Sequence, residues 1–343
     1  MKMEQKRYIL VTGGAGYIGS HTVVELVKNN FIPVILDDFR NAKTSVIERL
    51  EKITGVELEV ESESCHTIAV LDILAKKYDF WGVIHFAADK AVGESVKEPL
   101  KYYQNNLGGL IVVLDWMRRT QIKNLVFSSS CTVYGDPENK TVNEQSPTQK
   151  PTSPYGRTKL MCEDILKDAA QAYAQLSIVA LRYFNPIGAH ESALIGEEPQ
   201  GIPNNLLPYI TQTASGVREK LTVYGNDYQT VDGTCVRDYI HVTDLANAHV
   251  KALDFLAADT HSSYEVFNIG TGKGTSVLQF IEMFERVANT NLNWEFGKRR
   301  PGDVPEIFAE VDKARTALSW QAKYSVEEAI ASSWKWELNK QSL

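Results

Sequence analysis

The sequence predicts an α/β protein whose main domain is a doubly wound parallel sheet, with a smaller α/β substrate domain towards the C-terminus. Short segments that are apolar throughout alternate with segments of helical periodicity, which indicates a parallel sheet covered by helices on both faces. A glycine-rich turn follows the first apolar segment, and asparagine, proline and glycine become frequent after about residue 185. These observations favour a Rossmann-type sheet in the first part of the chain.

The expected elements follow in chain order. We expect strands at 8–12, 33–36, 82–86, 125–128 and 178–182, and helices at 19–29 and 107–120. We assign residues 1–186 to the first domain and residues 187–343 to the second. Residues 239–256 again have the pattern of a strand end, a cap and a helix, so the chain is expected to return to the first domain at about 239–260.

Composition narrows the class of protein. The chain has 343 residues and a net charge of −7, which argues against a nucleic-acid partner or an anionic membrane surface. The cysteines at 65, 131, 162 and 235 are scattered, so we expect neither a metal site nor a disulfide framework. The sequence contains neither a signal-like stretch nor an apolar run of about 18 residues, so a cytoplasmic protein is expected.

The glycine-rich turn has the pattern of a dinucleotide site. Gly14-Ala15-Gly16-Tyr17-Ile18-Gly19 fits G-x-G-x-x-G between a strand and a helix, and Gly13, Gly16 and Gly19 fit a three-residue spacing. Glycines let the backbone approach a pyrophosphate, which binds at the helix N-terminus. Asp37 ends the second strand, where a carboxylate accepts hydrogen bonds from the adenosine ribose and disfavours a 2′-phosphate. NAD is therefore favoured over NADP, although Arg40 lies close by.

The segment Ser153-Pro154-Tyr155-Gly156-Arg157-Thr158-Lys159 suggests the chemistry. Residues four apart share one helix face, so Tyr155 and Lys159 are neighbours in a helix. A Tyr-x-x-x-Lys pair is most often a half-buried aromatic covered by a lysine stem. Beside a nicotinamide, however, a phenol can act as a base if a cation lowers its pKa. Ser130 or Thr132, after an apolar strand, could hold a sugar hydroxyl beside Tyr155.

Several motifs together resemble one family. The segments "TGGAGYIGSH", "HFAADKAVGESV", "FSSSCTVYG", "PYGRTK", "RYFNPIGAH", "GIPNNLLPYI", "VRDYIHVTDLA" and "RRPGD" resemble the extended short-chain dehydrogenase/reductase superfamily and, within it, the UDP-glucose (UDP-galactose) 4-epimerases. The resemblance runs from about residue 8 to residue 320. It implies reversible C4 epimerisation of a UDP-hexose through a 4-keto sugar, with NAD retained through the cycle.

The resemblance also implies residue roles. Tyr155 would take the 4-OH proton, Lys159 would lower the tyrosine pKa and bind the nicotinamide ribose, and Ser130 or Thr132 would bridge to O4. Contacts to NAD would come from Gly13, Gly16, Tyr17, Ile18, Gly19, Asp37, Asn41, Asp72, Ile73, Phe86, Ala87, Lys90, Asn105, Ser130, Tyr155, Lys159 and Tyr183. Contacts to the UDP-sugar would come from Lys90, Ser130, Tyr155, Asn185, Asn204, Asn205, Leu206, Tyr224, Arg237, Arg300, Asp303 and Ile307.

Two departures from the family pattern bear on specificity. Asn41-Ala42 stands where Asn-Ser is common, so one hydroxyl contact on the adenosine side is missing. Ile307 occupies a position that lines the sugar C2 pocket in the family, where tyrosine is restrictive and cysteine or serine leaves room for an N-acetyl group. Plain glucose and galactose substrates are favoured, and turnover of UDP-N-acetylhexosamines stays an alternative.

The sequence also bears on three alternative functions and on the oligomeric state. A 4,6-dehydratase of the same superfamily would carry an Asp-Glu pair after the strand-end threonine, but Thr132 is followed by Val133-Tyr134. A one-way reductase would exchange its nicotinamide at each turnover, which the sequence does not exclude. A non-catalytic NAD-binding sensor would not need an intact Tyr-Lys-Ser set. A homodimer is expected, with the helix at 107–120 and the helix carrying Tyr155 as candidate contact elements.

Overall fold

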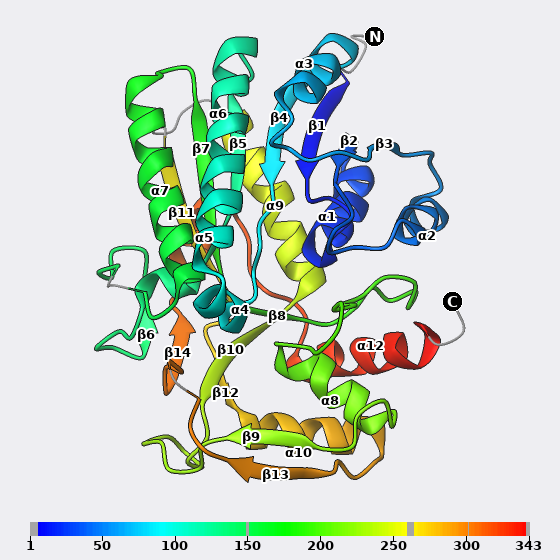
Figure 1. Cartoon of the computed structure of the whole chain (residues 1–343), viewed down its shortest axis with the longest axis vertical. Helices are drawn as coiled ribbons and strands as arrows, with labels where there is room; N and C mark the ends of the chain where they lie inside the picture. The colour runs from blue at the N-terminus through cyan, green and yellow to red at the C-terminus, as the bar shows by residue number, and fades with distance from the viewer. Residues whose placement is uncertain (1–5, 149–150, 259–263, 301, 341–343) are drawn as a thin grey trace.

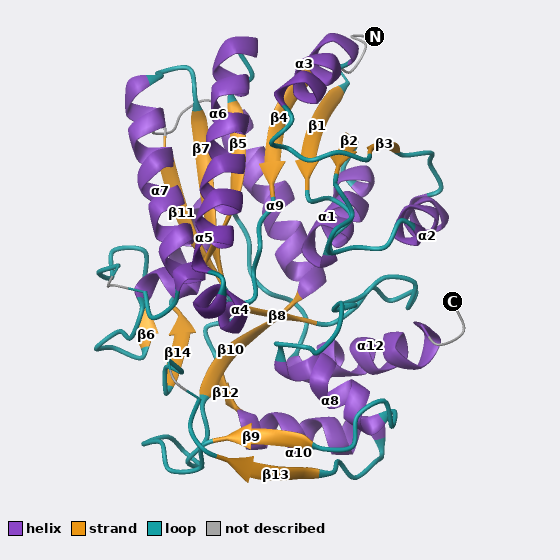
Figure 2. Ribbon diagram, in the orientation of Figure 1, coloured by secondary structure: helices purple, strands orange, loops and turns teal. Residues whose placement is uncertain are grey.

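The computed structural model of the chain describes residues 6–148, 151–258, 264–300 and 302–340. Its main feature is a seven-stranded, entirely parallel sheet in the order β11-β7-β5-β4-β1-β2-β3 (Figures 1 and 2). The strands are β1 (Arg7–Thr12), β2 (Phe31–Leu36), β3 (Glu59–Glu61), β4 (Phe80–His85), β5 (Asn124–Ser130), β7 (Ser177–Tyr183) and β11 (Tyr264–Ile269).

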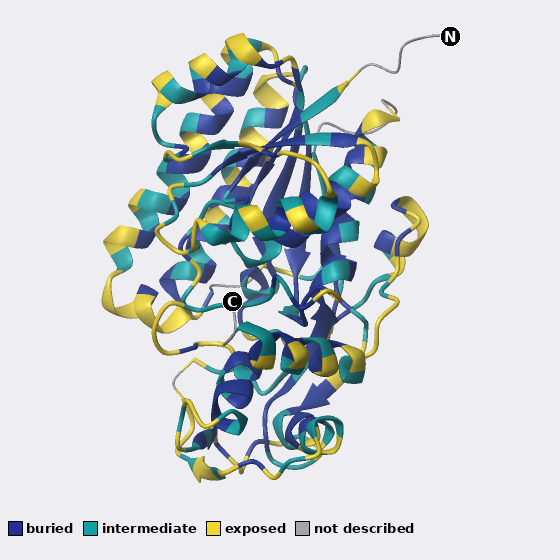
Figure 3. Ribbon diagram, turned by 90° about the vertical axis from the view of Figure 1, so that its right-hand side faces the viewer, coloured by how far each residue is buried: buried dark blue, intermediate teal, exposed yellow. Residues whose placement is uncertain are grey.

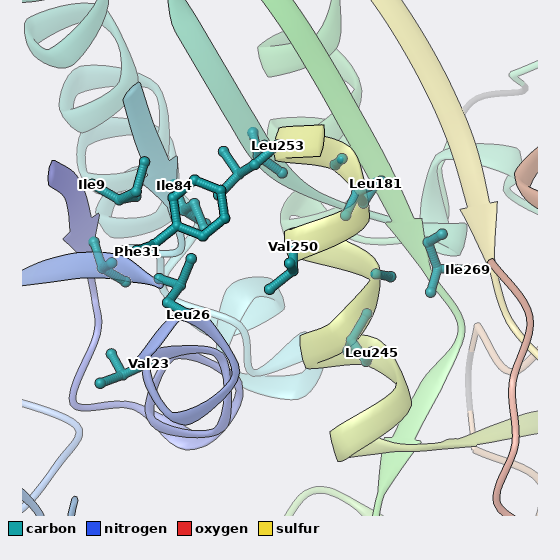
Figure 4. Close-up of a cluster of buried hydrophobic side chains, with 14 of the residues drawn as sticks. Ile9, Val23, Leu26, Phe31, Ile84, Leu181, Leu245, Val250, Leu253 and Ile269 are labelled. Atoms are coloured by element: carbon teal, nitrogen blue, oxygen red, sulfur yellow. The ribbon is translucent and has the colours of Figure 1, made fainter. Parts of the chain in front are cut away.

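Helices cover both faces of this sheet because successive strand residues point to opposite sides. Ile9 and Val11 of β1 belong to one buried cluster, whereas Leu10 between them belongs to the other. The first cluster packs against α1 (Tyr17–Lys28) and α9 (Val242–Ala257), as Figure 4 shows with Val23, Leu26, Leu245, Val250 and Leu253. The second packs against α3 (Ile68–Lys77), α6 (Gly108–Thr120) and α7 (Pro154–Ala172). Figure 3 shows the strands buried between partly exposed helices.

A second, smaller region lies beyond the carboxyl ends of the main strands (Figure 1). Its sheet runs β12-β10-β14-β6, and β8 also pairs with β10. Its elements are β6 (Thr141–Val142), β8 (Asn185–Ile187), α8 (Leu206–Ala214), β9 (Leu221–Tyr224), β10 (Val236–His241), β12 (Gly274–Ser276), α10 (Val277–Ala288), β13 (Trp294–Gly297), β14 (Glu306–Ala309) and α12 (Val326–Asn339). Four further helices complete the described chain: α2 (Ser45–Thr54), α4 (Val92–Lys97), α5 (Pro99–Tyr102) and α11 (Asp312–Ala317).

The predicted fold class is confirmed, and so are the five predicted strands: four have slightly wider bounds, and β4 is shifted to Phe80–His85 from the predicted 82–86. The helices predicted at 19–29 and 107–120 form as α1 and α6, the latter after a π-helical segment at Tyr103–Leu107. The chain also re-enters the main sheet late: α9 packs on α1, and β11 pairs with β7. The sequence analysis did not identify β3 and β11, the two edge strands.

The residues that the structure describes bear on cysteine pairing, metal clusters and membrane-spanning helices. All four cysteines are free thiols. Among the residues that the structure describes, acidic, histidine and cysteine side chains form no cluster suited to a metal ion. None of the described helices is long and apolar enough to cross a membrane.

Candidate active site

A cavity of about 560 Å³ opens at the carboxyl ends of the main strands. The loops after β1, β2, β3 and β4 line it, together with Tyr155 and Lys159 of α7. The segment 195–205 and Trp336 of α12 complete the wall from the second region. Ligands of parallel α/β sheets bind at this edge.

The glycine turn after β1 leaves no room for side chains. Gly13 has φ +73°, and a Cβ there would lie 2.8 Å from the amide nitrogen of Ala87. A Cβ on Gly19 would lie 2.3 Å from the carbonyl oxygen of Gly13. The N-cap residue of α1 is Gly16, and no described side chain caps this helix. Its first-turn N–H groups are therefore available to an anion, as a pyrophosphate requires.

The carboxylate of Asp37 is held at the mouth of this turn. It accepts hydrogen bonds from the backbone N–H of Ala15 (2.9 Å) and of Phe39 (2.9 Å). Burial raises the pKa of Asp37, and these two hydrogen bonds oppose the rise. Arg40 donates to Asp38 (2.7 Å) and to the side-chain oxygen of Asn105 (3.1 Å), so its guanidinium is already engaged. This arrangement suits a ribose diol better than a 2′-phosphate.

Most residues predicted to contact the dinucleotide line this one cavity. They are Gly13, Gly16, Tyr17, Ile18, Gly19, Asp37, Asn41, Phe86, Ala87, Lys90, Asn105, Tyr155, Lys159 and Tyr183. The glycine cradle, the uncapped helix end and the ribose-facing carboxylate together fit a dinucleotide.

The prediction that Asp72 and Ile73 contact the dinucleotide does not hold in this geometry. Both lie on α3, where Asp72 forms an ion pair with Arg119 (3.1 Å) and Ile73 is 61% exposed. Ser64 and Cys65, which follow β3, line the cavity instead. The family resemblance alone implied this contact. The rule that ligands meet the carboxyl ends of strands identifies Ser64 and Cys65 once β3 is recognised.

Tyr155 lies in the first turn of α7, and local sequence explains where that helix begins. Ser153 is the N-cap and accepts from the N–H of Gly156 (3.2 Å), and Pro154 takes the first helical position. The Ser130 hydroxyl lies against the phenol of Tyr155 and also accepts from the Thr132 hydroxyl (3.0 Å). The predicted grouping of Tyr155, Ser130 and Thr132 is therefore present.

Lys159 lies one turn further along α7 and is buried. Its ammonium donates to the carbonyl oxygen of Ser128 (2.6 Å) and to the Ser128 hydroxyl (3.2 Å). It also lies 4.9 Å from the centre of the Phe127 ring. Lys159 is thus fixed against the strand whose end carries Ser130.

Burial disfavours the charged forms of both Tyr155 and Lys159. Burial raises the pKa of Tyr155 to about 12, and the Ser130 hydroxyl opposes this rise only in part. Burial also lowers the pKa of Lys159 to about 8. A low-dielectric site penalises the charged form of each group. In the protein chain by itself, the proton therefore rests on the phenol.

Tyr183 supports this site from β7. Its hydroxyl lies 2.5 Å from Nε2 of His249, whose Nδ1 lies 2.8 Å from the carbonyl oxygen of Leu245. A carbonyl only accepts, so Nδ1 carries the proton of this imidazole and Nε2 accepts from Tyr183. The ring of Phe86 packs on the other side of His249.

A second group of predicted residues lies in the second region, on β9, on β10 and in the loop between β13 and β14. Arg300 donates to Asp303 (2.8 Å) and lies 5.8 Å from the centre of the Tyr224 ring. Arg237 is near enough to oppose the rise in the pKa of the Cys235 thiol that burial causes, and Asp303 adds to that rise. The structure thus brings Tyr224, Arg237, Arg300 and Asp303 together.

The remaining predicted substrate residues are spread around these two groups. Asn204 and Asn205 line the cavity, Asn205 is the N-cap of α8, and Leu206 begins that helix. Asn185 lies on β8, opposite Tyr239 of β10. Ile307 pairs with Arg237 across β10 and β14, but it is 4% exposed and packs with Val133 and Tyr134. It therefore lies behind the turn that carries Thr132.

Charged residues that the sequence analysis missed bridge the cavity. Glu197 accepts from Lys90 (3.4 Å) and from the side chain of Asn205 (2.6 Å). Glu198 pairs with Lys43 (2.5 Å) and Arg49 (3.8 Å). Lys43, Arg49 and Lys90 lie more than 100 residues from Glu197 and Glu198 in the chain, and no local pattern identifies such contacts.

A family model described as "GDP-mannose 4,6 dehydratase" matches residues 10–333. The Asp-Glu pair expected of a dehydratase is missing here, because Val133 and Tyr134 follow Thr132 and both are fully buried.

The individual proteins that are similar to the chain are described as 4-epimerases and not as dehydratases. A UDP-glucose 4-epimerase of Yersinia pestis is 49% identical over 330 residues, which cover 96% of this chain and 97% of the relative. The crystal structure of UDP-glucose 4-epimerase from Bifidobacterium longum in complex with NAD+ and UDP has a TM-score of 0.94 and 42% identity, covering 97% of this chain and 99% of that one. The UDP-Glc/GlcNAc 4-epimerase of Campylobacter jejuni has a TM-score of 0.84 and 36% identity, covering 97% and 99%.

Proposed function

The chain belongs to the UDP-glucose 4-epimerases of the extended short-chain dehydrogenase/reductase family, and we propose how its own residues interconvert UDP-glucose and UDP-galactose with a retained NAD. One observation carries the proposal: Tyr155, Lys159, Ser128 and Ser129 line a cavity shaped for a dinucleotide, and the Ser130 hydroxyl lies against the phenol of Tyr155.

The chain's own groups hold the cofactor in defined places. The N–H groups at the start of α1 face the pyrophosphate, and Asp37 binds the adenosine ribose. Lys159 and Tyr183 line the same cavity beside Tyr155 and would hold the nicotinamide end of the cofactor. When bound, NAD supplies reversible acceptance of a hydride from C4 of the hexose and its positive ring charge.

Tyr155 moves the proton in this proposal. Its phenolic oxygen accepts the proton of the sugar 4-OH as C4 is oxidised, and returns it when C4 is reduced on the opposite face. Ser130 orients O4, and Thr132 fixes the Ser130 hydroxyl through the 3.0 Å hydrogen bond. Lys159 stabilises the phenolate, which burial alone disfavours.

Inversion at C4 requires the 4-keto sugar to present its other face, so the nucleotide must be held more firmly than the hexose. Arg237 and Arg300 can bind diphosphate oxygens with both arms of the guanidinium. The uncapped N-terminus of α8 at Asn205 and Leu206 adds backbone N–H donors. Binding of the diphosphate would exchange Asp303 as the partner of Arg300 for phosphate oxygens.

A second candidate activity is epimerisation of UDP-N-acetylhexosamines. Ile307 supports it because its side chain is smaller than the tyrosine that restricts the C2 pocket in the family. Against it, Ile307 is buried behind Val133 and Tyr134. We therefore propose glucose and galactose as the main substrates. A non-catalytic sensor is disfavoured, because Tyr155, Lys159 and Ser130 are intact and adjacent.

We also propose a cytoplasmic homodimer that pairs the faces of α6 and α7. Ile111 of α6 is 51% exposed and Met161 of α7 is 43% exposed, and these helices lie side by side in Figure 1. The four unpaired thiols agree with a reducing compartment. Sedimentation velocity tests the dimer: Ile111→Lys with Met161→Lys should give a monomer, and an unchanged dimer would contradict this contact.

The activity is tested with purified protein and UDP-galactose, without added NAD, by following UDP-glucose on anion-exchange chromatography. We expect an equilibrium mixture to form, because the cofactor stays bound. UDP-N-acetylgalactosamine in the same assay tests the role of Ile307. If UDP-glucose fails to appear even with NAD supplied, the proposed activity is wrong.

A further inference from the structure

One face of α7 carries three functional groups in series. Tyr155, Lys159 and Glu163 are spaced four apart, so their side chains point the same way from the helix. Each meets one of three successive serines of β5: Ser130 lies beside Tyr155, Ser128 accepts from Lys159, and the Ser129 hydroxyl donates to Glu163 (2.6 Å). The proposed mechanism uses only the first two of these contacts.

Glu163 is paired with Arg182 of β7 inside the protein. Nε of Arg182 donates to one carboxylate oxygen (2.9 Å) and Nη2 donates to the other (2.7 Å). The side chains are 0% and 3% exposed, respectively. Such a buried pair is costly to form and more costly to break on one side, since a single charge is then left unpaired.

The same arginine reaches the second sheet. Nη1 of Arg182 donates to the hydroxyl of Tyr134 (2.9 Å), which donates to the side-chain oxygen of Asn268 (2.6 Å). The Asn268 amide donates to the carbonyl oxygen of Val142 on β6 (2.9 Å). Strand β6 pairs with β14, which carries Ile307. A continuous series of hydrogen bonds therefore joins α7, β5 and β7 to the smaller sheet, which contains β6 and β14.

We propose that Glu163 and Arg182 are positioning residues for catalysis, which fix α7 in register with Ser128–Ser130 and balance the charge around Lys159. The inference rests on the proposed epimerase function. It assigns these residues no contact with substrate or cofactor. They act through Tyr155 and Lys159, whose protonation depends on the charges buried nearby.

The two members of the pair carry opposite charges, and Glu163 acts directly on Lys159 by favouring its charged form. The other titratable groups near Lys159 are Tyr155 and Cys162 on its own helix and His85 on β4, and Arg182 joins this set through its ion pair with Glu163. Glu163→Gln leaves the cation of Arg182 unbalanced, which disfavours charged Lys159. Arg182→Gln leaves the anion of Glu163 unbalanced, which favours it.

The test is the pH dependence of kcat for UDP-galactose epimerisation by the NAD-loaded enzyme, for wild type, Glu163→Gln and Arg182→Gln. We expect the two variant profiles to separate by at least about half a pH unit, with Glu163→Gln at lower pH. Both variants break the same ion pair, so a merely structural role moves them together. Asp164→Asn is the matched control, since Asp164 is the neighbouring exposed acid of α7. Its profile should coincide with that of wild type.

If the pH profiles of Glu163→Gln and Arg182→Gln coincide, the inference is overturned, whether or not both are shifted from wild type. An inactive wild type would instead overturn the proposed function. If either glutamine variant does not fold, Ser129→Ala takes its place, because it removes only the hydroxyl that donates to Glu163. It should lower kcat severalfold with KM for UDP-galactose unchanged, and an unchanged kcat would contradict the positioning role.

Discussion

At the scale of single residues, the site combines Tyr155 and Lys159. The reaction needs a phenolate and an ammonium, but burial disfavours the charged form of each group. Burial raises the pKa of Tyr155 to about 12 and lowers that of Lys159 to about 8. A phenolate–ammonium pair is therefore the less stable arrangement until a further positive charge arrives, such as that of an oxidised nicotinamide ring. The phenolate, which is the form that accepts the 4-OH proton, is therefore favoured only when the oxidant is in place.

Tyr155→Phe tests the proton-transfer role directly. The phenylalanine keeps the ring but has no proton acceptor, so the epimerisation rate should fall by about 10²- to 10⁴-fold. Epimerisation of UDP-galactose at neutral pH is the measurement, with bound NAD quantified after denaturation. Tyr173→Phe at the far end of α7 is the control and should keep full activity. A Tyr155→Phe enzyme within threefold of wild type would exclude this tyrosine as the base.

At the scale of elements, sequence patterns predicted what is local. Apolar strands, the glycine turn and the i, i+4 pair depend on neighbours within a few residues, and they are present as expected. Asp72 and Ile73 show the limit. The family resemblance implied a contact with the ligand, but periodicity puts them on the solvent side of α3. Glu198 and Trp336 join the cavity through tertiary contacts that no short pattern encodes.

The turn between β1 and α1 should not tolerate Gly19→Ala. The added Cβ would lie 2.3 Å from the Gly13 carbonyl oxygen and 2.8 Å from the Cα of Gly14, so the turn must open. Since the cradle then loses its shape, the purified variant should contain much less NAD than wild type. Gly55→Ala, at a helix end with φ +71° and open space around it, is the control: its added Cβ strains the backbone but meets no atom, so NAD content should stay that of wild type. Equal NAD content in Gly19→Ala and wild type would contradict this account.

The buried carboxylate of Asp238 holds strand β10 against its neighbours and accepts four hydrogen bonds. The donors are the N–H groups of Gly272 (2.9 Å) and Ala309 (3.1 Å), together with the N–H (2.8 Å) and hydroxyl (2.6 Å) of Thr271. Asp238→Asn replaces one acceptor oxygen with a donor, leaving buried N–H groups unpaired. The free energy of unfolding should fall by about 2–4 kcal/mol, which urea denaturation measures.

The exposed acid Asp227, paired with Arg299, is the matched control for Asp238. Asp227→Asn should change the free energy of unfolding by less than about 0.5 kcal/mol. If both asparagine variants have the same stability, the hydrogen bonds of Asp238 are not what holds β10 to β14.

At the scale of the whole molecule, ion pairs join the two regions over the cofactor cavity. Lys43 and Arg49 reach Glu198, Lys90 reaches Glu197, and Trp336 donates to the carbonyl oxygen of Glu197 (3.2 Å). The segment 195–205 therefore closes the cavity with contacts that salt weakens. Retention of NAD should depend on these contacts as much as on the glycine turn.

Glu198→Gln is the test of this closure. It removes both ion pairs of Glu198 but keeps the shape of the side chain, so NAD should leave the enzyme several times faster.

In wild type, raising NaCl from about 50 mM to about 500 mM should also speed the loss of NAD, because the exposed Lys43–Glu198 pair is screened. The variant should respond less to salt, since it lacks the pairs that are screened. Glu295→Gln, which breaks the exposed Lys220–Glu295 pair far from the cavity, is the control. The rate is measured by dilution into an NAD-consuming enzyme that traps released cofactor. If the variant and wild type release NAD at one rate at both salt concentrations, these ion pairs do not retain the cofactor.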